Sequence, residues 1–156
     1  MNKHKAVSPV VLWLVIIVGG IMLVVSTPDG KFFNSNIFTS FLFLLSIVYW
    51  FSFFNKAIKI NRKAVYSADK IDELIQKGVY GVVRHPIYGA DIILFWGIFV
   101  SWPYLRTFMV ALWATLMLLF WMKVEEIALV QKFGDVYDNY KKQVPMVIPK
   151  FWKKKT

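Results

Sequence analysis

Four long apolar segments alternate with polar segments along the chain. They are nearly free of charged residues and cover Pro9–Val25, Ile37–Phe54, Ile87–Trp102 and Thr107–Met122. As helices that rise about 1.5 Å per residue, they would each reach roughly 24–27 Å, which flanking aromatic and basic residues can extend across a bilayer. No segment shows apolar residues with a period of two, so a β-barrel is not expected. The pattern therefore predicts an all-α integral membrane bundle of about four transmembrane helices.

Polar stretches predict short amphipathic helices outside the membrane. The stretch 67–78, SADKIDELIQKG, begins with an N-capping serine, carries an apolar stripe and ends with a glycine. The fourth apolar segment should continue as a helix until Gly134, and a further short helix, DVYDNYKKQV, should end before Pro145. No polar stretch is long enough to bury its own core, so residues 1–156 are expected to form a single membrane domain.

The basic residues predict the orientation in the membrane. Of the 19 lysines and arginines, all except Lys31 and Arg106 flank the apolar segments at ends that would share one side. By the positive-inside rule, both termini and the loop between the second and third spans are cytoplasmic. The net charge of +10 then reflects topology and contact with anionic lipids rather than nucleic-acid binding. We expect a multi-pass protein of a prokaryotic inner membrane, the latter by analogy alone.

Several kinds of site are excluded by what the sequence lacks. There are no cysteines, so disulfides, thiolate nucleophiles and cysteine-ligated metals are excluded. His4 and His85 are the only histidines, which excludes a histidine-rich metal site, and no metal is expected. The glycine-rich dinucleotide fingerprint, the phosphate-binding loop and the HExxH motif are all missing. A cofactor would therefore need an unusual pocket at the membrane.

The stretch RHPIY stands where the third span should begin. Pro86 suits the first position of a helix, which places His85 near its cap. The free N–H groups of that helix end and the Arg84 guanidinium would favour an anion, although such residues also form ordinary basic-aromatic belts. Asp91 should lie about one turn inside the membrane, where a carboxylate is a functional candidate. Alternatively, Asp91 is interfacial and reaches water or pairs with Arg84.

Two further pairs of residues follow the fourth apolar segment. Glu125 and Glu126 are adjacent, so their side chains point about 100° apart on a helix. At most one should face the bundle fully, while the other pairs with Lys123 or a basic loop residue, unless both belong to a solvated helix end. Tyr137 and Tyr140 are three positions apart and share a helix face. They could pack on lipid or core, or line a pocket for a flat ring or a cation.

Taken together, these motifs resemble a known family. GVYGVVRHPIY, a hairpin of two spans and VEEIALVQKFGDVYDNYKKQVPMVIP, in this order, are similar to the isoprenylcysteine carboxyl methyltransferases and the related phospholipid methyltransferases. The resemblance covers residues 74–149. It implies a membrane methyltransferase that uses S-adenosylmethionine, bound in a cytoplasmic pocket, and acts on a lipophilic acceptor. The residues implied to line this pocket are Tyr80, Arg84, His85, Pro86, Tyr88, Glu125, Glu126, Tyr137 and Tyr140.

Catalytic roles depend on the acceptor, which the resemblance leaves open. An arginine such as Arg84 would position a carboxylate acceptor, whereas an amine acceptor must be neutral and would need a base such as Glu125 or Asp91. The acceptor classes include an isoprenylated cysteine, a phosphatidylethanolamine, an isoprenoid and a small hydrophobic thiol. Three positions where family members often have other residues, mostly basic ones, differ here. These differences bear on the identity of the methyl acceptor more than on binding of the cofactor. The replacing residues are Gly81, Trp121 and Met146.

Two other functions remain as alternatives. A membrane sterol-reductase-like enzyme has a similar C-terminal half but uses NADPH, whose phosphates would favour more basic residues around the pocket. A non-catalytic small membrane protein would bind lipid or assist a partner. In that case, replacing His85 or Glu125 with alanine would leave its function unchanged. The oligomeric state is not predicted.

Overall fold

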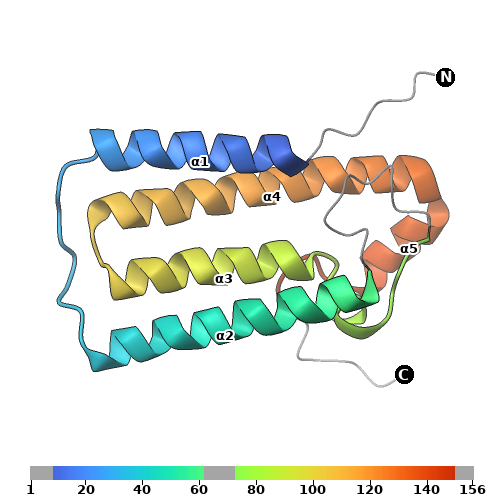
Figure 1. Ribbon diagram of the computed structural model, residues 1–156. Coiled ribbons are helices and arrows are strands. Elements are labelled where there is room, and N and C mark those ends of the chain that lie inside the picture. Colours follow the sequence, from blue (N-terminus) through green and yellow to red (C-terminus); the bar gives the residue numbers. More distant parts are fainter. Residues whose placement is uncertain (1–8, 62–72, 150–156) are drawn as a thin grey trace.

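The computed structural model describes residues 9–61 and 73–149, and these residues form helices and connecting segments (Figure 1). One isolated antiparallel bridge joins Lys31 to Tyr104. In chain order, the elements are α1 (Pro9–Ser26), α2 (Ile37–Ile60), the short 3-10 helix η3 (Gly78–Gly81), α3 (Pro86–Ser101), α4 (Leu105–Phe133) and α5 (Asp135–Gln143).

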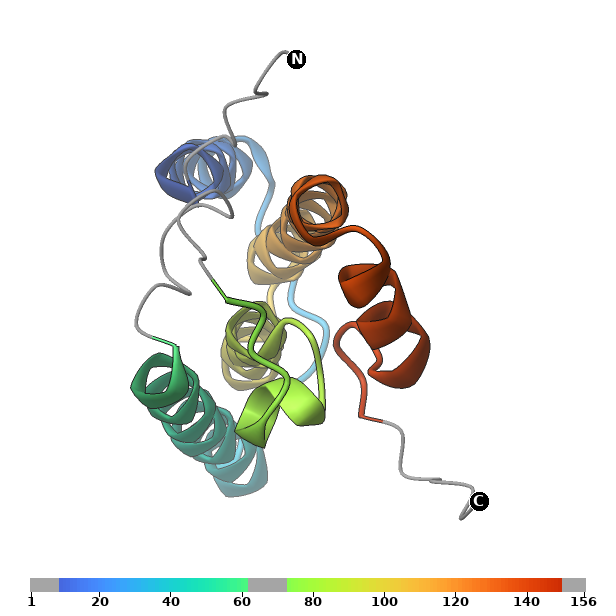
Figure 2. The same ribbon diagram turned by 90° about the vertical axis from the view of Figure 1, so that its right-hand side faces the viewer.

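The four long helices run antiparallel to their sequence neighbours. In space α2 packs on α3, α3 on α4 and α4 on α1 (Figures 1 and 2). Helices α1, α2 and α4 are long and apolar enough to cross a membrane, while α3 is a shorter apolar helix of 16 residues. The predicted all-α membrane bundle is therefore confirmed.

Local sequence signals set where several helices begin and end. Asn36 caps α2, because its side-chain oxygen accepts a hydrogen bond from the Thr39 backbone N–H at 3.1 Å. His85 is the N-cap of α3 and Pro86 follows at the first turn, as predicted. Gly134 separates α4 from α5 with φ of +55°, a left-handed conformation that favours glycine. The predicted ends at Gly134 and before Pro145 are confirmed.

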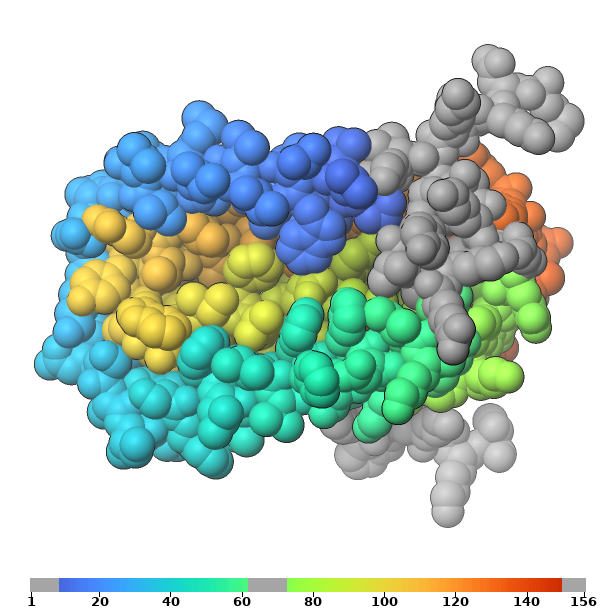
Figure 3. Space-filling view, in the orientation of Figure 1, coloured from blue at the N-terminus to red at the C-terminus, as the bar shows by residue number. Residues whose placement is uncertain are grey.

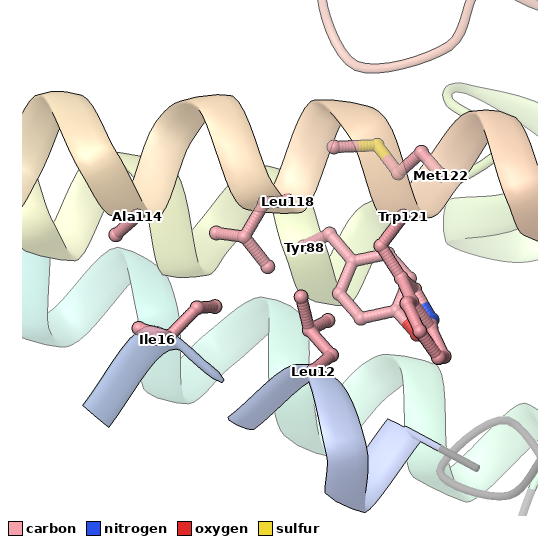
Figure 4. Close-up of a cluster of buried hydrophobic side chains, with 7 residues drawn as sticks. All are labelled: Leu12, Ile16, Tyr88, Ala114, Leu118, Trp121 and Met122. Atoms are coloured by element: carbon pink, nitrogen blue, oxygen red, sulfur yellow. The ribbon is translucent and has the colours of Figure 1, made fainter. Parts of the chain in front are cut away.

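An apolar cluster joins α1 to the centre of the bundle (Figure 4). It combines two residues of α1, one of α3 and four of α4. Burying these side chains is the main favourable contribution that holds α1 on α4. The members of this α1–α4 cluster are Leu12, Ile16, Tyr88, Ala114, Leu118, Trp121 and Met122.

Helices α2 and α3 approach closely through small residues. A Cβ added at Gly97 would lie 2.1 Å from Ser46 Oγ and 2.6 Å from Ser46 Cβ, distances that no real side chain tolerates. Small residues at such positions let two membrane helices come into backbone contact. The close packing fixes how α2 is placed against α3, which carries the RHPIY motif at its start.

Charged residues gather at one end of the bundle. Apart from Lys31 and Arg106, the basic residues in the described ranges lie toward the end that carries α5 (Figure 1). At the opposite end, Arg106 Nη2 pairs with Asp29 Oδ1 at 2.5 Å. This segregation agrees with the topology that the positive-inside rule predicts, and the cytoplasmic orientation stays a prediction.

The helix predicted over 67–78 is only partly within the described structure. Residues 67–72 lie outside it. Residues 73–77 are not helical, and the following turn, Gly78–Gly81, is a 3-10 helix. The C-terminal part of that prediction is therefore wrong. Gly78 has φ of +62°, and a Cβ there would lie 2.3 Å from Ile60 Cδ1. The backbone at Gly78 therefore packs closely against the end of α2.

Candidate active site

A cavity of about 60 Å³ lies at the charged end of the bundle, between η3, the start of α3, the end of α4 and α5. Leu74 and Ile75 contribute apolar walls. All the residues that the family resemblance implies for the pocket line it, except Glu126. They are Tyr80, Arg84, His85, Pro86, Tyr88, Glu125, Tyr137 and Tyr140.

Glu126 lies beside this cavity and binds Arg84. Arg84 Nε donates to Glu126 Oε1 at 2.7 Å, and Arg84 Nη2 lies 2.5 Å from the same oxygen. Both side chains are almost completely buried. Arg84 Nη1 also donates to the backbone oxygens of Lys141, at 3.2 Å, and of Val144. The guanidinium therefore connects the segment before α3 to the ends of α4 and α5.

The segment after α5 holds the RHPIY motif through its backbone. The Arg84 N–H donates to Pro145 O at 2.9 Å, and the His85 N–H donates to Met146 O at 3.0 Å. Gly89, one turn into α3, would place a Cβ only 3.1 Å from Val147 Cγ1. These contacts satisfy backbone groups at the helix start and fix the His85 side chain toward the cavity.

His85 stands between the two glutamates. Its Nδ1 lies 3.8 Å from Glu125 Oε2, and its Nε2 lies 3.4 Å from Glu126 Oε1 in a geometry that forms no hydrogen bond. Glu126 is buried and faces Arg84, whereas Glu125 is partly buried and borders the cavity. Glu126 faces the bundle fully and Glu125 only in part, which agrees with the expectation that at most one of them would do so. The basic loop residue Arg84 pairs with Glu126, the bundle-facing glutamate, and not with the other glutamate as expected.

Three buried polar atoms of the cavity residues have no hydrogen-bond partner within residues 9–61 and 73–149. They are Tyr80 Oη, His85 Nε2 and Glu125 Oε2. Buried polar groups in folded proteins are nearly always hydrogen-bonded, and each exception calls for an explanation. Here the three atoms belong to residues that line one cavity, which fits a polar ligand that would supply the missing partners.

Tyrosines form the remaining wall of the cavity. Tyr137 and Tyr140 share a face of α5 as predicted, with ring centroids 5.8 Å apart in an edge-to-face arrangement. The Tyr140 hydroxyl donates to Tyr80 O at 2.6 Å. Burial raises the pKa of Tyr80, Tyr137 and Tyr140 above the ordinary value, so all three hydroxyls stay protonated. Tyr88 stacks on His85 with centroids 5.8 Å apart.

Asp91 lies deeper in the bundle and does not line the cavity. Its side chain is buried, and Oδ1 accepts a hydrogen bond from Trp50 Nε1 of α2 at 2.6 Å. The alternative in which Asp91 pairs with Arg84 or reaches water is therefore wrong. Sequence reasoning missed Trp50, because nothing in the sequence marks one tryptophan of an aromatic span as a partner for a residue 41 positions later.

The three departures from the family pattern have different surroundings. Trp121 belongs to the α1–α4 cluster, where it lies with Tyr88 and Leu12 (Figure 4). Met146 packs against the same cluster. Gly81 is exposed, and a Cβ there would lie 3.0 Å from Gln76 O. Two positions where a basic residue is common therefore carry apolar side chains that complete the core beside the cavity.

The cavity as a whole suits a ligand with positive charge. Arg84 and Glu126 neutralise each other. Glu125, in contrast, has no arginine or lysine partner in the described part of the chain and borders the cavity beside tyrosine rings, with His85 Nδ1 3.8 Å from its Oε2. Aromatic faces and a carboxylate both attract cations. Among the residues that the structure describes, no cluster of three histidine, aspartate or glutamate side chains could hold a metal ion.

Comparison with known proteins points to one family. A family model described as phospholipid methyltransferase matches residues 10–136. The methanethiol S-methyltransferase of Pseudomonas deceptionensis is 36% identical over 73 residues, which are 46% of this chain and 26% of that protein. The methanethiol S-methyltransferase of Crocosphaera subtropica is 37% identical over 75 residues, 48% of this chain and 29% of that protein.

The matched segments therefore cover less than a third of these relatives' own length. No solved structure gives a significant match. The family model, in contrast, extends from the start of α1 to the start of α5 and so includes all four long helices and both glutamates. The chain belongs to the phospholipid methyltransferase family.

Proposed function

We propose that this protein is an S-adenosylmethionine-dependent methyltransferase that acts on a lipophilic acceptor at the membrane. The observation that carries the proposal is the cavity in which the motif residues of α3, α4 and α5 meet, with unpartnered polar atoms on Tyr80, His85 and Glu125. Membership of the phospholipid methyltransferase family supports the same reaction class.

The residues present fit this cofactor. When bound, S-adenosylmethionine supplies an electrophilic methyl group on a sulfonium. Glu125 Oε2 would accept hydrogen bonds from its ammonium or ribose hydroxyls, and the Tyr80 hydroxyl and His85 Nε2 would complete the polar contacts. The tyrosine rings would face its positive charge. The chain's own contribution is alignment and exclusion of water, which methyl transfer chiefly requires.

Arg84 has a positioning role in this proposal. Its guanidinium is already engaged by Glu126 and by two backbone oxygens, so it has little capacity left for a ligand. It holds the start of α3 against α4 and α5, and this fixes His85 and Tyr88 in the wall of the cavity. We therefore assign contact with the cofactor to the other motif residues first.

The cavity must widen when the cofactor binds. A volume of about 60 Å³ holds only a few water molecules, whereas a nucleoside is several times larger. Leu74 and Ile75 line the cavity from a segment without helical structure, so moving this segment costs fewer hydrogen bonds than moving a helix. We infer that these two side chains give way to the cofactor.

A hydrophobic thiol is the acceptor that the observations favour. Two curated relatives are named methanethiol S-methyltransferase. Trp121 and Met146 present apolar groups where family members often have a basic residue, so a carboxylate or a phosphate would meet no cation at these two positions. A thiol that partitions into the bilayer could enter between the helices, while the polar cofactor enters from the side with the basic residues, which we place in the cytoplasm.

The test is transfer of a labelled methyl group by the purified protein in detergent. The reaction would contain methyl-labelled S-adenosylmethionine and, in separate samples, decanethiol, decylamine and decanoate. We expect labelled methyl decyl sulfide, loss of this product with Glu125→Gln, and normal activity with Lys142→Ala, which alters an exposed residue of α5. Absence of transfer to all three acceptors would contradict the proposal.

A further inference from the structure

Asp91 is a buried carboxylate at membrane depth that the cavity does not explain. It lies six residues after the N-cap of α3 and is only 4% exposed. Trp50 Nε1 satisfies Oδ1 at 2.6 Å, but Oδ2 is buried and has no hydrogen-bond partner in the described ranges. An ionisable side chain inside a membrane is costly and marks function by default. A purely structural partner for Trp50 would need no charge.

Asp91 is connected to the cavity through Tyr88. The two residues are three positions apart on α3 and therefore share a face of the helix. Tyr88 lines the cavity, whereas Asp91 does not. Asp91 thus lies one helical turn deeper than the cavity wall, on the membrane side, where a lipophilic acceptor would approach.

The two candidate bases have different surroundings. Glu125 Oε2 lies 3.8 Å from His85 Nδ1, and Glu125 borders the cavity that we assign to the cofactor. Asp91 has one hydrogen bond, from an uncharged indole, which holds one oxygen and leaves the other for a donor. Both carboxylates keep one oxygen without a hydrogen-bond partner in the described ranges, but Glu125 borders the cavity that we assign to the cofactor. Asp91 is therefore the carboxylate that remains for the acceptor.

We propose that Asp91, oriented by Trp50, is the catalytic base that accepts the proton of the acceptor thiol. This step rests on the proposed function. The thiol S–H hydrogen-bonds to Oδ2. As a sulfur lone pair forms the bond to the methyl carbon, the bond from that carbon to the cofactor sulfur breaks, and its electron pair stays on the cofactor. The S–H electron pair remains on the acceptor sulfur, and the proton passes to Asp91 and later to water.

This reaction removes charge from a region of low dielectric. Before transfer, the Asp91 carboxylate is negative and the sulfonium is positive, and afterwards both are neutral. The products therefore need less solvation than the reactants, so a site with little water favours the forward step. An acceptor without a removable proton would gain nothing from Asp91.

Asp91→Asn tests this role, because the amide oxygen still accepts from Trp50 but cannot take a proton. We expect kcat with decanethiol to fall about 100-fold or more, with the Kd for S-adenosylmethionine by calorimetry and the Tm in detergent unchanged. With 4-nitrothiophenol, which is already a thiolate, the loss should nearly disappear. Trp50→Phe should give a smaller loss with the same dependence on thiol acidity.

Three results would overturn the proposal. Equal losses with both thiols, or a loss that parallels a fall in Tm and cofactor affinity, would make Asp91 structural. An unchanged kcat in Asp91→Asn would show that Asp91 has no role in methyl transfer. If Asp91→Asn does not fold, the test uses wild type with thiols of different acidity. A catalytic base predicts that kcat is nearly independent of thiol acidity. Rates that rise in proportion to the fraction of thiolate in solution would show that no base takes part. Wild type that binds no S-adenosylmethionine would instead refute the proposed function itself.

Discussion

Arg84 and Glu126 are 42 positions apart in the sequence and meet in a buried ion pair, with Arg84 Nε 2.7 Å from Glu126 Oε1. The pair joins the segment before α3 to the end of α4. Both halves of the family motif are therefore brought together by the α3–α4 hairpin. Backbone oxygens of Lys141 and Val144 complete the coordination of the guanidinium, so α5 is fixed by the same side chain.

Breaking this pair from one side should destabilise the protein strongly. Arg84→Met leaves the Glu126 carboxylate buried without a cation, and such a change costs about 3–5 kcal/mol. The double variant Arg84→Met/Glu126→Leu should recover most of that loss, because no charge remains to be desolvated. Thermal unfolding in detergent, monitored by circular dichroism, measures the stability of the single and the double variant. A single variant as stable as wild type would mean that water reaches Glu126.

The hydroxyl of Tyr140 should contribute to stability and to its pH dependence. Tyr140→Phe removes the bond to Tyr80 O and leaves a buried carbonyl unsatisfied, at a cost of about 1–3 kcal/mol. Burial raises the pKa of Tyr140 above its ordinary value of 10.0, so the unfolded chain ionises first as the pH rises. The contribution of the Tyr140 hydroxyl to stability is therefore complete below pH 10.0 and is lost progressively as the pH rises above it.

Accordingly, the Tm of wild type should fall more steeply above pH 10.0 than the Tm of Tyr140→Phe. The matched comparison is between these two proteins, since all lysines and the other tyrosines titrate in both. Identical slopes would show that the Tyr140 hydroxyl is solvated in the folded protein.

Gly97 should be essential for the packing of α2 on α3. In Gly97→Ala, the new methyl group would overlap Ser46, and separating the helices should cost about 1–3 kcal/mol. Gly20→Ala is the control, because the nearest atom to its Cβ, Val110 Cγ1, is 3.8 Å away. We expect a lower Tm for Gly97→Ala but not for Gly20→Ala, and the Tm of Gly97→Ala should recover when Ser46→Gly is added. Equal Tm values for both alanine variants would contradict the close approach.

Trp121 should act through packing rather than through the chemistry of a basic residue. It is 8% exposed within the α1–α4 cluster, so Trp121→Arg would place a charge among apolar side chains. We expect a clear loss of thermal stability and no gain in methyl transfer, whereas Trp121→Phe should be milder. A stable and more active arginine variant would indicate that this position opens into the cavity.

Much of the fold could be predicted because local sequence determines it. Apolar runs define membrane helices directly, and Pro86 and Gly134 mark helix limits through their own backbone preferences. Helix α2 extends to Ile60, six residues beyond the apolar run, because polar residues can continue a helix past the membrane. The prediction of a helix over 73–77 is wrong, and the close contact of the adjacent Gly78 with Ile60 of α2 is a tertiary effect that the local pattern does not show.

The site was predictable only in part. The motif named the polar and aromatic residues of the cavity wall apart from Asn61, because the spacing of each half is local, but it missed the apolar residues Leu74, Ile75, Ile87 and Leu129. Sequence alone does not give which glutamate binds Arg84, because the pair joins residues of two different segments of the fold. The same holds for the hydrogen bond from Trp50 to Asp91 and for the backbone oxygens of Pro145 and Met146. These contacts join segments whose relative placement only the folded bundle defines.

The most direct test of the central claim is calorimetric titration of the purified protein in detergent. S-adenosylmethionine and NADPH would be titrated separately into wild type and His85→Ala, with Lys142→Ala as the control. We predict micromolar binding of S-adenosylmethionine by wild type and the control, its loss in His85→Ala, and no binding of NADPH. Binding of NADPH alone would contradict the methyltransferase assignment, and binding of neither ligand would return the RHPIY motif to the role of a membrane anchor.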